Sequence, residues 1–371
     1  MKMKSTFLTI LLLVTTLVAS MPITVPKIIN PFIEKDTIYV SDYGFYASGE
    51  DWQPAIQKAI DDAYKRGIPQ VVVSKELTVN SPINLKEGVT LKGGYNAGFF
   101  NGMRWYTDEN NSVSVPKIKA GKDFAGGILE YTYTANDKGV SVENIVIDAN
   151  KKADYGISVQ SNSLRELNVN LKDLGVQGAK KDGISLNRVL TTKVLNCNIS
   201  ANNGYGINFS VGASDSTLIG NYIHGNQTGG IRMAGGSYYN QISAGKIEDN
   251  YGTGILFDGA NGGSNRHIVS NVIFHVNNGP AIAAVNGASA IVSVSQFTRS
   301  GVTQTNELST NILTRGTGSL LQVDGSQFSV GDKTIYNASA IEDSKILLSD
   351  SLVDKADAFS GNVIRNNVTT Q

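Results

Sequence analysis

Several residue types are scarce in this chain of 371 residues, and each scarcity limits what the protein can be. The only cysteine, Cys197, excludes an internal disulfide. The formal net charge is zero, with 32 basic and 32 acidic residues, and no polybasic run occurs. This balance argues against nucleic acid and anionic lipid as partners. Proline is rare at 8 residues while glycine is abundant at 39, as expected of a fold with many tight corners and few helices.

A Gly-Ile step returns through the middle of the chain, each time followed by alternating polar and apolar residues. Its glycine positions are Gly156, Gly183, Gly206, Gly230 and Gly254, with Ala281 in a sixth copy. The spacings are 27, 23, 24, 24 and 27 residues, a period that indicates a stacked repeat. Such a solenoid grows by adding turns, so the length does not require several domains. We predict an all-β solenoid over residues 136–362, followed by a frayed tail over residues 363–371.

Residues 1–20 have the pattern of a secretory signal peptide. Lys2 and Lys4 precede an apolar stretch from Leu8 to Val18, and the small residues Ala19 and Ser20 follow. The alternative, an uncleaved membrane anchor, fits less well because the apolar stretch is short for a spanning helix. Residues 21–36 contain three prolines and are predicted to be an extended leader. Export without disulfides indicates a bacterial protein that is secreted or periplasmic, with no membrane span after cleavage.

Residues 37–94 are predicted to begin the solenoid and to close its N-terminal end. A strand at residues 37–40 and a turn at residues 41–44 come first. A helix is expected from Asp51 to Arg66, with Asp51 as its N-cap and Gly67 ending it. Short β-branched strands follow, separated by turn residues.

Three motifs in this segment resemble the N-terminal part of the pectate-lyase-like β-helix proteins, which include phage tailspikes and bacterial polysaccharide-active enzymes. The motifs are Val40-Ser41-Asp42-Tyr43-Gly44, Ala55-Ile56-Gln57-Lys58-Ala59-Ile60-Asp61 and Val71-Val72-Val73. The resemblance covers residues 37–94 and implies a right-handed parallel β-helix. In that family the helix caps the open end of the solenoid, a role that the amphipathic pattern of residues 52–63 also suits.

The glycine rhythm is interrupted over residues 95–135, which we interpret as an aromatic loop excursion from an early turn. Its aromatic residues are Phe99, Phe100, Trp105, Tyr106, Tyr131 and Tyr133. They either pack on the side of the solenoid or form a wall of a sugar-binding groove, since aromatic faces stack well on sugar rings.

The repeat also predicts which side chains point outward, because side chains alternate along a strand. A second inward column precedes the glycines, and we place in it Ile147, Val176, Ile199, Ile223, Ile247 and Ile273. The residues after these should face out: Asp148, Gln177, Ser200, His224, Glu248 and Phe274. Asp249 and His275 then fall in the next column. Recurring asparagines are expected to satisfy backbone groups at the corners: Asn144, Asn196, Asn221 and Asn271.

Two groups of these residues are candidates for chemistry. Asp154 and Asp182 lie on consecutive rungs at a separation compatible with a hydrolytic carboxylate pair. Arg232 is the only cation in its outward column and is placed to bind a sugar carboxylate. The further candidate substrate contacts around them are Tyr155, Lys181, Tyr205 and Asn208. Asp258, three rungs from Asp182, is too far away to pair with it. The alternative for this group is a solvated strand edge.

The second group combines His224 and Glu248, which fall in one column on adjacent rungs. A carboxylate one rung away can orient a histidine and raise its pKa, so these two are candidate catalytic residues. The alternatives are a surface salt-bridge ladder and, less well supported, a metal site that also uses Asp249 and His275.

The best-known catalytic motifs of this fold are absent. Asn202-Asn203 stands where polygalacturonase-like enzymes carry a carboxylate pair. Tyr155-Gly156-Ile157 is followed by Ser158-Val159-Gln160, whereas alginate epimerases carry Tyr-Gly-x-Asp-Pro-His. Two hypotheses stay open. The first is a secreted hydrolase or lyase acting on an anionic, uronate-containing polysaccharide, without a cofactor unless a lyase uses calcium. The second is a non-catalytic β-helix that binds glycan or serves as a surface or matrix component.

Overall fold

The structure is a computed structural model that describes residues 36–94, 115–133, 139–166, 168–298, 300, 310–329, 336–354 and 359–370. Residues 36–371 form a unit distinct from residues 1–35. The predicted signal peptide, all but the last residue of the predicted leader, and Phe99, Phe100, Trp105 and Tyr106 therefore lie outside the described residues. No helix in the described part of the chain combines the length and the apolar character that crossing a membrane requires.

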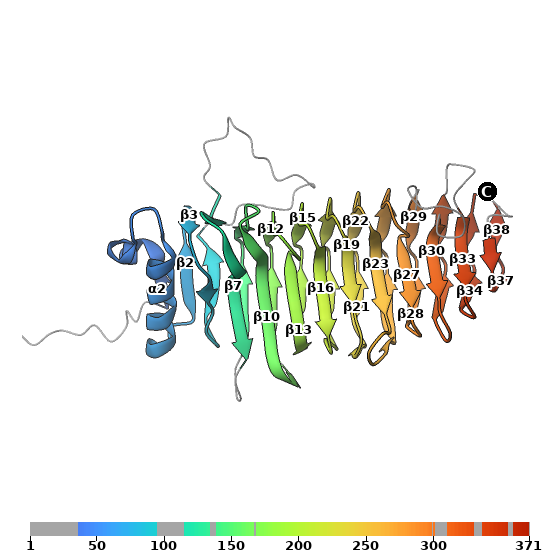
Figure 1. Cartoon of the computed structure of the whole chain (residues 1–371), viewed down its shortest axis with the longest axis horizontal. Coiled ribbons are helices and arrows are strands. Elements are labelled where there is room, and N and C mark those ends of the chain that lie inside the picture. The colour runs from blue at the N-terminus through green and yellow to red at the C-terminus, as the bar shows by residue number, and fades with distance from the viewer. Residues whose placement is uncertain are drawn as a thin grey trace, which may run out of the picture. The chain divides into compact units, whose positions relative to one another are not determined.

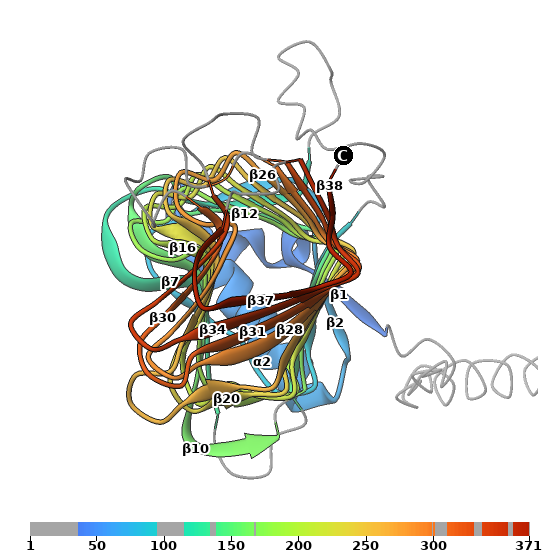
Figure 2. The same ribbon diagram turned by 90° about the vertical axis from the view of Figure 1, so that its right-hand side faces the viewer.

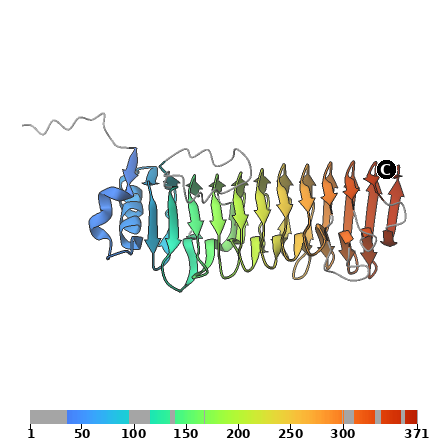
Figure 3. The ribbon, with the colours of Figure 1, turned by 90° about the horizontal axis from the view of Figure 1, so that it is seen from above.

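The chain winds through three parallel sheets in turn, so that each turn adds one strand to each sheet (Figure 1). Viewed along the stack, the three sheets enclose a common interior (Figure 2), and Figure 3 shows the successive rungs in chain order. The described residues form sheets of 13, 12 and 11 strands, which are named here by these numbers. A fourth sheet pairs β20 (Ser237–Tyr238) with β24 (Ser264–Asn265).

The 13-stranded sheet contains β1 (Thr37–Tyr39), β2 (Gln70–Val73), β5 (Thr90–Gly93), β8 (Val140–Glu143), β11 (Val169–Lys172), β14 (Lys193–Leu195), β17 (Thr217–Ile219), β21 (Gln241–Ser243), β25 (His267–Ser270), β28 (Ser289–Ser293), β31 (Leu320–Asp324), β34 (Lys345–Ser349) and β37 (Val363–Asn366). The 12-stranded sheet contains β3 (Glu76–Val79), β6 (Lys117–Ala120), β9 (Val146–Asp148), β12 (Gly175–Gln177), β15 (Asn198–Ser200), β18 (Tyr222–His224), β22 (Lys246–Glu248), β26 (Ile273–His275), β29 (Gln296–Thr298), β32 (Gln327–Ser329), β35 (Leu352–Val353) and β38 (Thr369–Thr370). The 11-stranded sheet contains β4 (Ile83–Asn84), β7 (Phe124–Tyr133), β10 (Ala153–Glu166), β13 (Ile184–Leu190), β16 (Tyr205–Val211), β19 (Gly229–Met233), β23 (Thr253–Asp258), β27 (Ile282–Val285), β30 (Thr310–Arg315), β33 (Tyr336–Ile341) and β36 (Phe359–Gly361).

The isoleucines after the repeated glycines stack in register and form the core, as predicted. Ile157 pairs with Ile184, and this column continues through the later rungs of the 11-stranded sheet. Its members are fully buried: Ile157, Ile184, Ile207, Ile231, Ile255 and Ile282. The glycines themselves lie against the next rung, and a Cβ at Gly230 would be 2.4 Å from the carbonyl oxygen of Gly254. The repeated glycine is therefore a packing requirement of the stack.

The N-terminal end is closed by a 3-10 helix, η1 (Val40–Tyr46), and by α2 (Gln53–Arg66). Helix α2 lies across the first strands in Figure 1 and buries Ile56 and Ile60 completely. It begins two residues later than predicted, but the Asp51 carboxylate still accepts the amide hydrogen of Gln53 at 3.0 Å. Gly67 ends the helix in the left-handed region, with φ of 66°, as expected.

Asparagines hold two corners of the solenoid in different ways. Asn144, Asn196 and Asn271 adopt φ between 51° and 53° at the corner that leads into the 12-stranded sheet, which confirms their position at a corner. Asn221 satisfies backbone groups as predicted, since its side chain accepts the N–H of Cys197 and donates to the carbonyl of Val194. The next corner contains a buried ladder that the sequence analysis missed, in which each side-chain amide bonds the following one at 2.9 Å. The ladder consists of Asn202, Asn226, Asn250 and Asn277.

Two predicted boundaries and the predicted face of one side chain were wrong. Residues 117–120 and 124–133 form strands β6 and β7 of the solenoid, and Tyr131 and Tyr133 are buried in its core, outside any excursion. The tail predicted to fray forms β37 and β38, which pair with β34 and β35. Finally, Ile247 pairs with Phe274 and Glu248 with His275, so Ile273 faces outward. The loop between β23 and β25 is longer than its predecessor, and a slip of one residue exchanges the faces of a strand.

Candidate functional site

Polar side chains gather in two clusters on the outer faces of neighbouring sheets. The Asp182 cluster lies on the 11-stranded sheet and contains Asp182, Tyr205, Asn208, Arg232 and Asp258. The Glu248 cluster lies on the 12-stranded sheet and contains Asn198, Tyr222, His224, Lys246, Glu248 and His275. The corner with the asparagine ladder separates them, since Asn202, Asn226 and Asn250 follow the strands of one sheet and precede those of the other.

The predicted carboxylate pair of Asp154 and Asp182 is not formed as a pair. Asp154 binds Lys181, whose Nζ lies 3.1 Å from Oδ2, and the same ammonium lies 5.5 Å from the ring centre of Tyr155. This hydrogen bond raises the pKa of Lys181. Asp182 faces the following rung instead. The two carboxylates therefore bind different residues.

Asp182 is almost buried, at 9% exposed, and both of its oxygens accept hydrogen bonds. Oδ1 accepts the backbone N–H of Tyr205 at 2.8 Å, and Oδ2 accepts the side-chain amide of Asn208 at 2.9 Å. The ring of Tyr205 lies over Gly229, where a Cβ would approach it to 2.8 Å. Burial raises the pKa of Tyr205, so its phenol stays protonated. These contacts tie one rung to the next.

Arg232 is also engaged, because its Nη2 lies 2.9 Å from Oδ2 of Asp258. Burial raises the pKa of Asp258, but hydrogen bonds from Arg232, Asn286 and the Ala260 amide outweigh it, and the net pKa lies below the ordinary value. The cation predicted to bind a sugar carboxylate therefore already has an internal partner.

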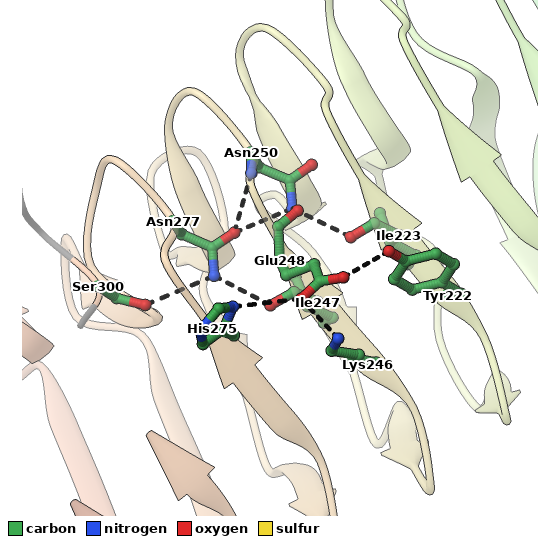
Figure 4. A network of polar contacts seen from close by, with 9 residues as sticks. All are labelled: Tyr222, Ile223, Lys246, Ile247, Glu248, Asn250, His275, Asn277 and Ser300. Atoms are coloured by element: carbon green, nitrogen blue, oxygen red, sulfur yellow. Dashed lines mark hydrogen bonds and ion pairs between the residues drawn. The ribbon is translucent and has the colours of Figure 1, made fainter. Parts of the chain in front are cut away.

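The Glu248 cluster is more compact. Figure 4 shows Tyr222, Lys246 and His275 pointing toward the carboxylate of Glu248. The Tyr222 hydroxyl donates to Oε1, while Lys246 Nζ and His275 Nδ1 lie 2.6 Å and 3.3 Å from Oε2. Burial raises the pKa of Glu248, but the hydrogen bonds from Lys246 and Tyr222 outweigh it, and the net pKa is lowered. Glu248 is thus a buried carboxylate held in its ionised form by three neighbours.

His224 stands beside this carboxylate without bonding it. Its ring stacks on Tyr222, with centres 4.2 Å apart, and its Nε2 lies 3.1 Å from Oδ1 of Asn198. That oxygen is an acceptor, which assigns the proton to Nε2 and leaves the lone pair on Nδ1. Burial lowers the pKa of His224 and outweighs the opposite effect of Glu248. Glu248 therefore acts on the pKa of His224 in the predicted direction, but burial makes the net pKa lower than the ordinary value.

The register confirms one predicted pairing and changes another. His224 pairs with Glu248 as predicted, whereas His275 joins this column and not that of Asp249. Tyr222 and Lys246 were missed, although they stand two residues before His224 and Glu248 and so share their outward face. Within the described residues, no three His, Cys, Asp or Glu side chains are placed to hold a metal ion.

Comparisons with known proteins agree with this architecture. Residues 126–297 match the family model described as a right-handed β-helix region. The protein is a right-handed parallel β-helix. The predicted resemblance to pectate-lyase-like proteins is thereby confirmed for the fold. No curated protein sequence matches the chain.

Solved structures that are similar to this β-helix include parts of enzymes and a surface adhesin. The A-module of the mannuronan C-5 epimerase AlgE6 of Azotobacter vinelandii has a TM-score of 0.67 and 17% identity, over 90% of this chain and 99% of that one. The enzymatically active domain of tailspike protein 2 of bacteriophage CBA120 has a TM-score of 0.62 and 11% identity, over 85% and 48% of the chains. PfbA, a surface adhesin of Streptococcus pneumoniae, has a TM-score of 0.59 and 13% identity, over 90% and 92%. These identities establish the shared fold alone.

The geometry of this β-helix favours one kind of chemistry over another. A glycosidic hydrolase needs a carboxylic acid with a raised pKa to protonate the leaving group. The pKa values of Glu248 and Asp258 are lowered instead, and Asp182 has both oxygens bonded. His224, by contrast, is a half-buried neutral imidazole with a lone pair, which is the property of a general base.

Proposed function

We propose that the protein acts on an anionic, uronate-containing polysaccharide by removing the proton at C5 of a uronate, as a lyase or an epimerase. The observation that carries this proposal is His224, whose pKa is lowered by burial and whose orientation is held by Asn198 and Tyr222. Export through residues 1–20 to the periplasm or the medium is part of the proposal, since such polymers lie outside the cytoplasm.

Each group of the Glu248 cluster has a role in this step. Nδ1 of His224 accepts the C5 proton, and Lys246 stabilises the charge that develops on the uronate carboxylate. An ammonium has three donors, of which one is used on Glu248, so Lys246 can bind both carboxylates. Glu248 acts as a positioning residue that holds Lys246 and Tyr222.

After the proton transfer the reaction has two outcomes. In a lyase the C4–O4 bond breaks while the C4=C5 double bond forms, and the imidazolium returns its proton to the departing oxygen. In an epimerase water delivers a proton to the opposite face of C5, and the imidazolium releases its proton to the solvent. One of the similar structures is the A-module of a mannuronan C-5 epimerase, an enzyme named for a uronate polymer, which supports testing such polymers first.

The decisive assay incubates the protein with polymannuronate, polyguluronate, polygalacturonate and a glucuronate-containing polymer, with dextran as the neutral control. Ultraviolet absorbance detects unsaturated products, and nuclear magnetic resonance detects inversion at C5. Removal of a general base costs about 10²–10⁴ in rate, so His224→Gln should lose that factor. Thr298→Ser, in the same outward column three rungs later, should retain wild-type activity. Full activity in His224→Gln would refute the assignment.

The pH profile and calcium dependence test the same proposal. A base works in its neutral form, so activity should fall only as pH drops below the ordinary histidine value of 6.5. Because Lys246 supplies the cation, a chelator should leave the rate unchanged; calcium dependence would show that Lys246 does not fill this role.

A second function, glycan binding without turnover, is favoured by a specific observation. Asp182, Asp258 and Glu248 are each engaged in internal hydrogen bonds or ion pairs, as in a structural surface. Absence of product on every polymer of the panel, together with retained binding to one of them, would support this function and exclude the catalytic one.

A further inference from the structure

Lysines gather at the corner between the 12-stranded and 11-stranded sheets, over three successive turns. We name this surface the lysine corner, and it consists of Lys122, Lys151, Lys152, Lys180 and Lys181. Backbone hydrogen bonds stack the three turns directly. The N–H of Phe124 donates to the carbonyl of Lys152 at 3.1 Å, and the N–H of Lys180 donates to the carbonyl of Ala153 at 3.0 Å.

The positive charge of this corner is only partly compensated. Lys180 binds Asp123 at 2.5 Å and Lys181 binds Asp154 at 3.1 Å. Lys122 and Lys151 are exposed, and neither makes an ion pair with any described residue.

Of the other acidic groups nearby, Glu130 is partly exposed, is in register with Ser158 and accepts the N–H of Gly127 at 2.9 Å, whereas Asp148 and Asp182 do not neutralise this charge at the surface. Asp148 and Asp182 are both 9% exposed. Asp148 accepts the N–H of Asn150, and Asp182 accepts hydrogen bonds from Tyr205 and Asn208.

The lysine corner lies two strands before His224 along the stack. Lys180 and Lys181 follow β12, and the next two strands of that sheet are β15 and β18, whose last residue is His224. Two strand spacings amount to roughly 9–10 Å along the stack. Gln177, the last residue of β12, is in register with His224, so the base lies on the 12-stranded side of the corner and a ligand reaches it by turning from the corner onto that sheet.

We propose that the lysine corner is the docking track of an anionic polysaccharide that runs along the solenoid axis toward His224. The corner carries one or two lysines in each of three successive turns, which suits a single chain with one carboxylate per sugar. Its outward neighbours Ser158, Ser185 and Gln160 offer hydroxyl and amide groups that match sugar hydroxyls. Among the described aromatic residues at this corner, Phe124 packs against the core and Tyr155 faces the Lys181 ammonium, so they do not form a row of free platforms such as single-stranded nucleic acid uses for its bases.

This inference rests on the proposed function for the direction of the track and for the polymer class, whereas binding does not require turnover. The test compares wild type with the double variant Lys122→Gln/Lys151→Gln, which removes no ion pair among the described residues. The matched control is Lys65→Gln/Lys193→Gln, which removes the same charge from the cap helix and from the 13-stranded sheet. Binding is measured to immobilised polygalacturonate and alginate over a salt series, with dextran, a single-stranded oligonucleotide and phosphatidylglycerol vesicles alongside.

An exposed pair of charges contributes about 0.2–1 kcal/mol, so two lysines should weaken polyuronate binding by about 2- to 30-fold. The salt dependence should become shallower, and the control should stay within about 2-fold of wild type. Equal binding by the lysine variant and wild type would overturn the inference. Lysine-dependent binding that is tighter for the oligonucleotide or the vesicles would overturn its polysaccharide assignment.

The two proposals fail in different ways. Lysine-dependent binding of a polyuronate without any product supports the track and refutes the chemistry. Product formation with KM unchanged in the lysine variant supports the chemistry and refutes the track. A raised KM with unchanged kcat supports both.

Discussion

His267, at the start of β25, should make the stability of the protein strongly dependent on pH. Its side chain is fully buried, stacks on Phe257 with ring centres 4.7 Å apart, and places Nε2 2.9 Å from the Ser264 hydroxyl. Burial lowers the pKa of His267 to about 3. The imidazole is therefore neutral in the folded protein, while the unfolded chain has the ordinary histidine value of about 6.5.

The sign and size of the effect follow from this difference. Below pH 6.5 the unfolded chain takes up a proton that the folded protein refuses until about pH 3, so falling pH favours unfolding. The stabilisation that comes from keeping His267 neutral in the folded protein is fully present above pH 6.5. It is lost progressively between pH 6.5 and 3. At about 1.36 kcal/mol per pKa unit, the free energy of unfolding drops by about 2 kcal/mol at pH 5.

Urea unfolding of wild type and His267→Gln at pH 7.5 and pH 5.0 tests this prediction. The variant loses the ring stacking and should be less stable at both values, but the fall between them should be about 2 kcal/mol smaller than in wild type. His224 and His275 are present in both proteins, so their effects cancel in the comparison. The same fall in wild type and His267→Gln would refute the reasoning.

Three further substitutions test the packing and the site. Asn226→Ala removes a fully buried member of the asparagine ladder and should lower the free energy of unfolding by about 2–4 kcal/mol. The control Gln227→Ala, at the exposed neighbouring residue, should lower it by less than about 0.5 kcal/mol. Equal losses in the two variants would contradict a stabilising role of the ladder. Asp182→Asn should retain wild-type turnover, because its carboxylate binds the next rung; lost turnover with an unchanged melting temperature would make Asp182 catalytic. Gly230→Ala should destabilise by more than about 2 kcal/mol, since its Cβ would meet the Gly254 carbonyl oxygen, and an unchanged melting temperature would contradict that contact.

The architecture was predictable because it follows from two periods that the sequence displays. The glycine spacing marks the turns, and the alternation around Ile184 or Ile231 identifies the inward side chains. The prediction failed where loop length changed, as at Ile273, since one residue exchanges the two faces of a strand. The spacing of 27 between Gly254 and Ala281 already contained the correct offset, which equals that from Ile247 to Phe274.

The site was predictable only in part. Register alone placed His224 beside Glu248, but the direction of the His224 pKa depends on burial, which sequence spacing does not reveal. Likewise, the lysines of the lysine corner occur singly or in pairs along the chain, so no polybasic run was visible. Stacking of three turns brings them together. Charge patches on a solenoid are therefore assembled by its period.

The most direct test of the account measures proton removal itself. A polyuronate labelled with deuterium at C5 is incubated with the protein, and release of the label into water is followed by nuclear magnetic resonance. This readout serves a lyase and an epimerase alike. The account predicts release by wild type and a loss of about 10²–10⁴ in its rate in His224→Gln. No release from any polyuronate, or equal release by the variant, would contradict it.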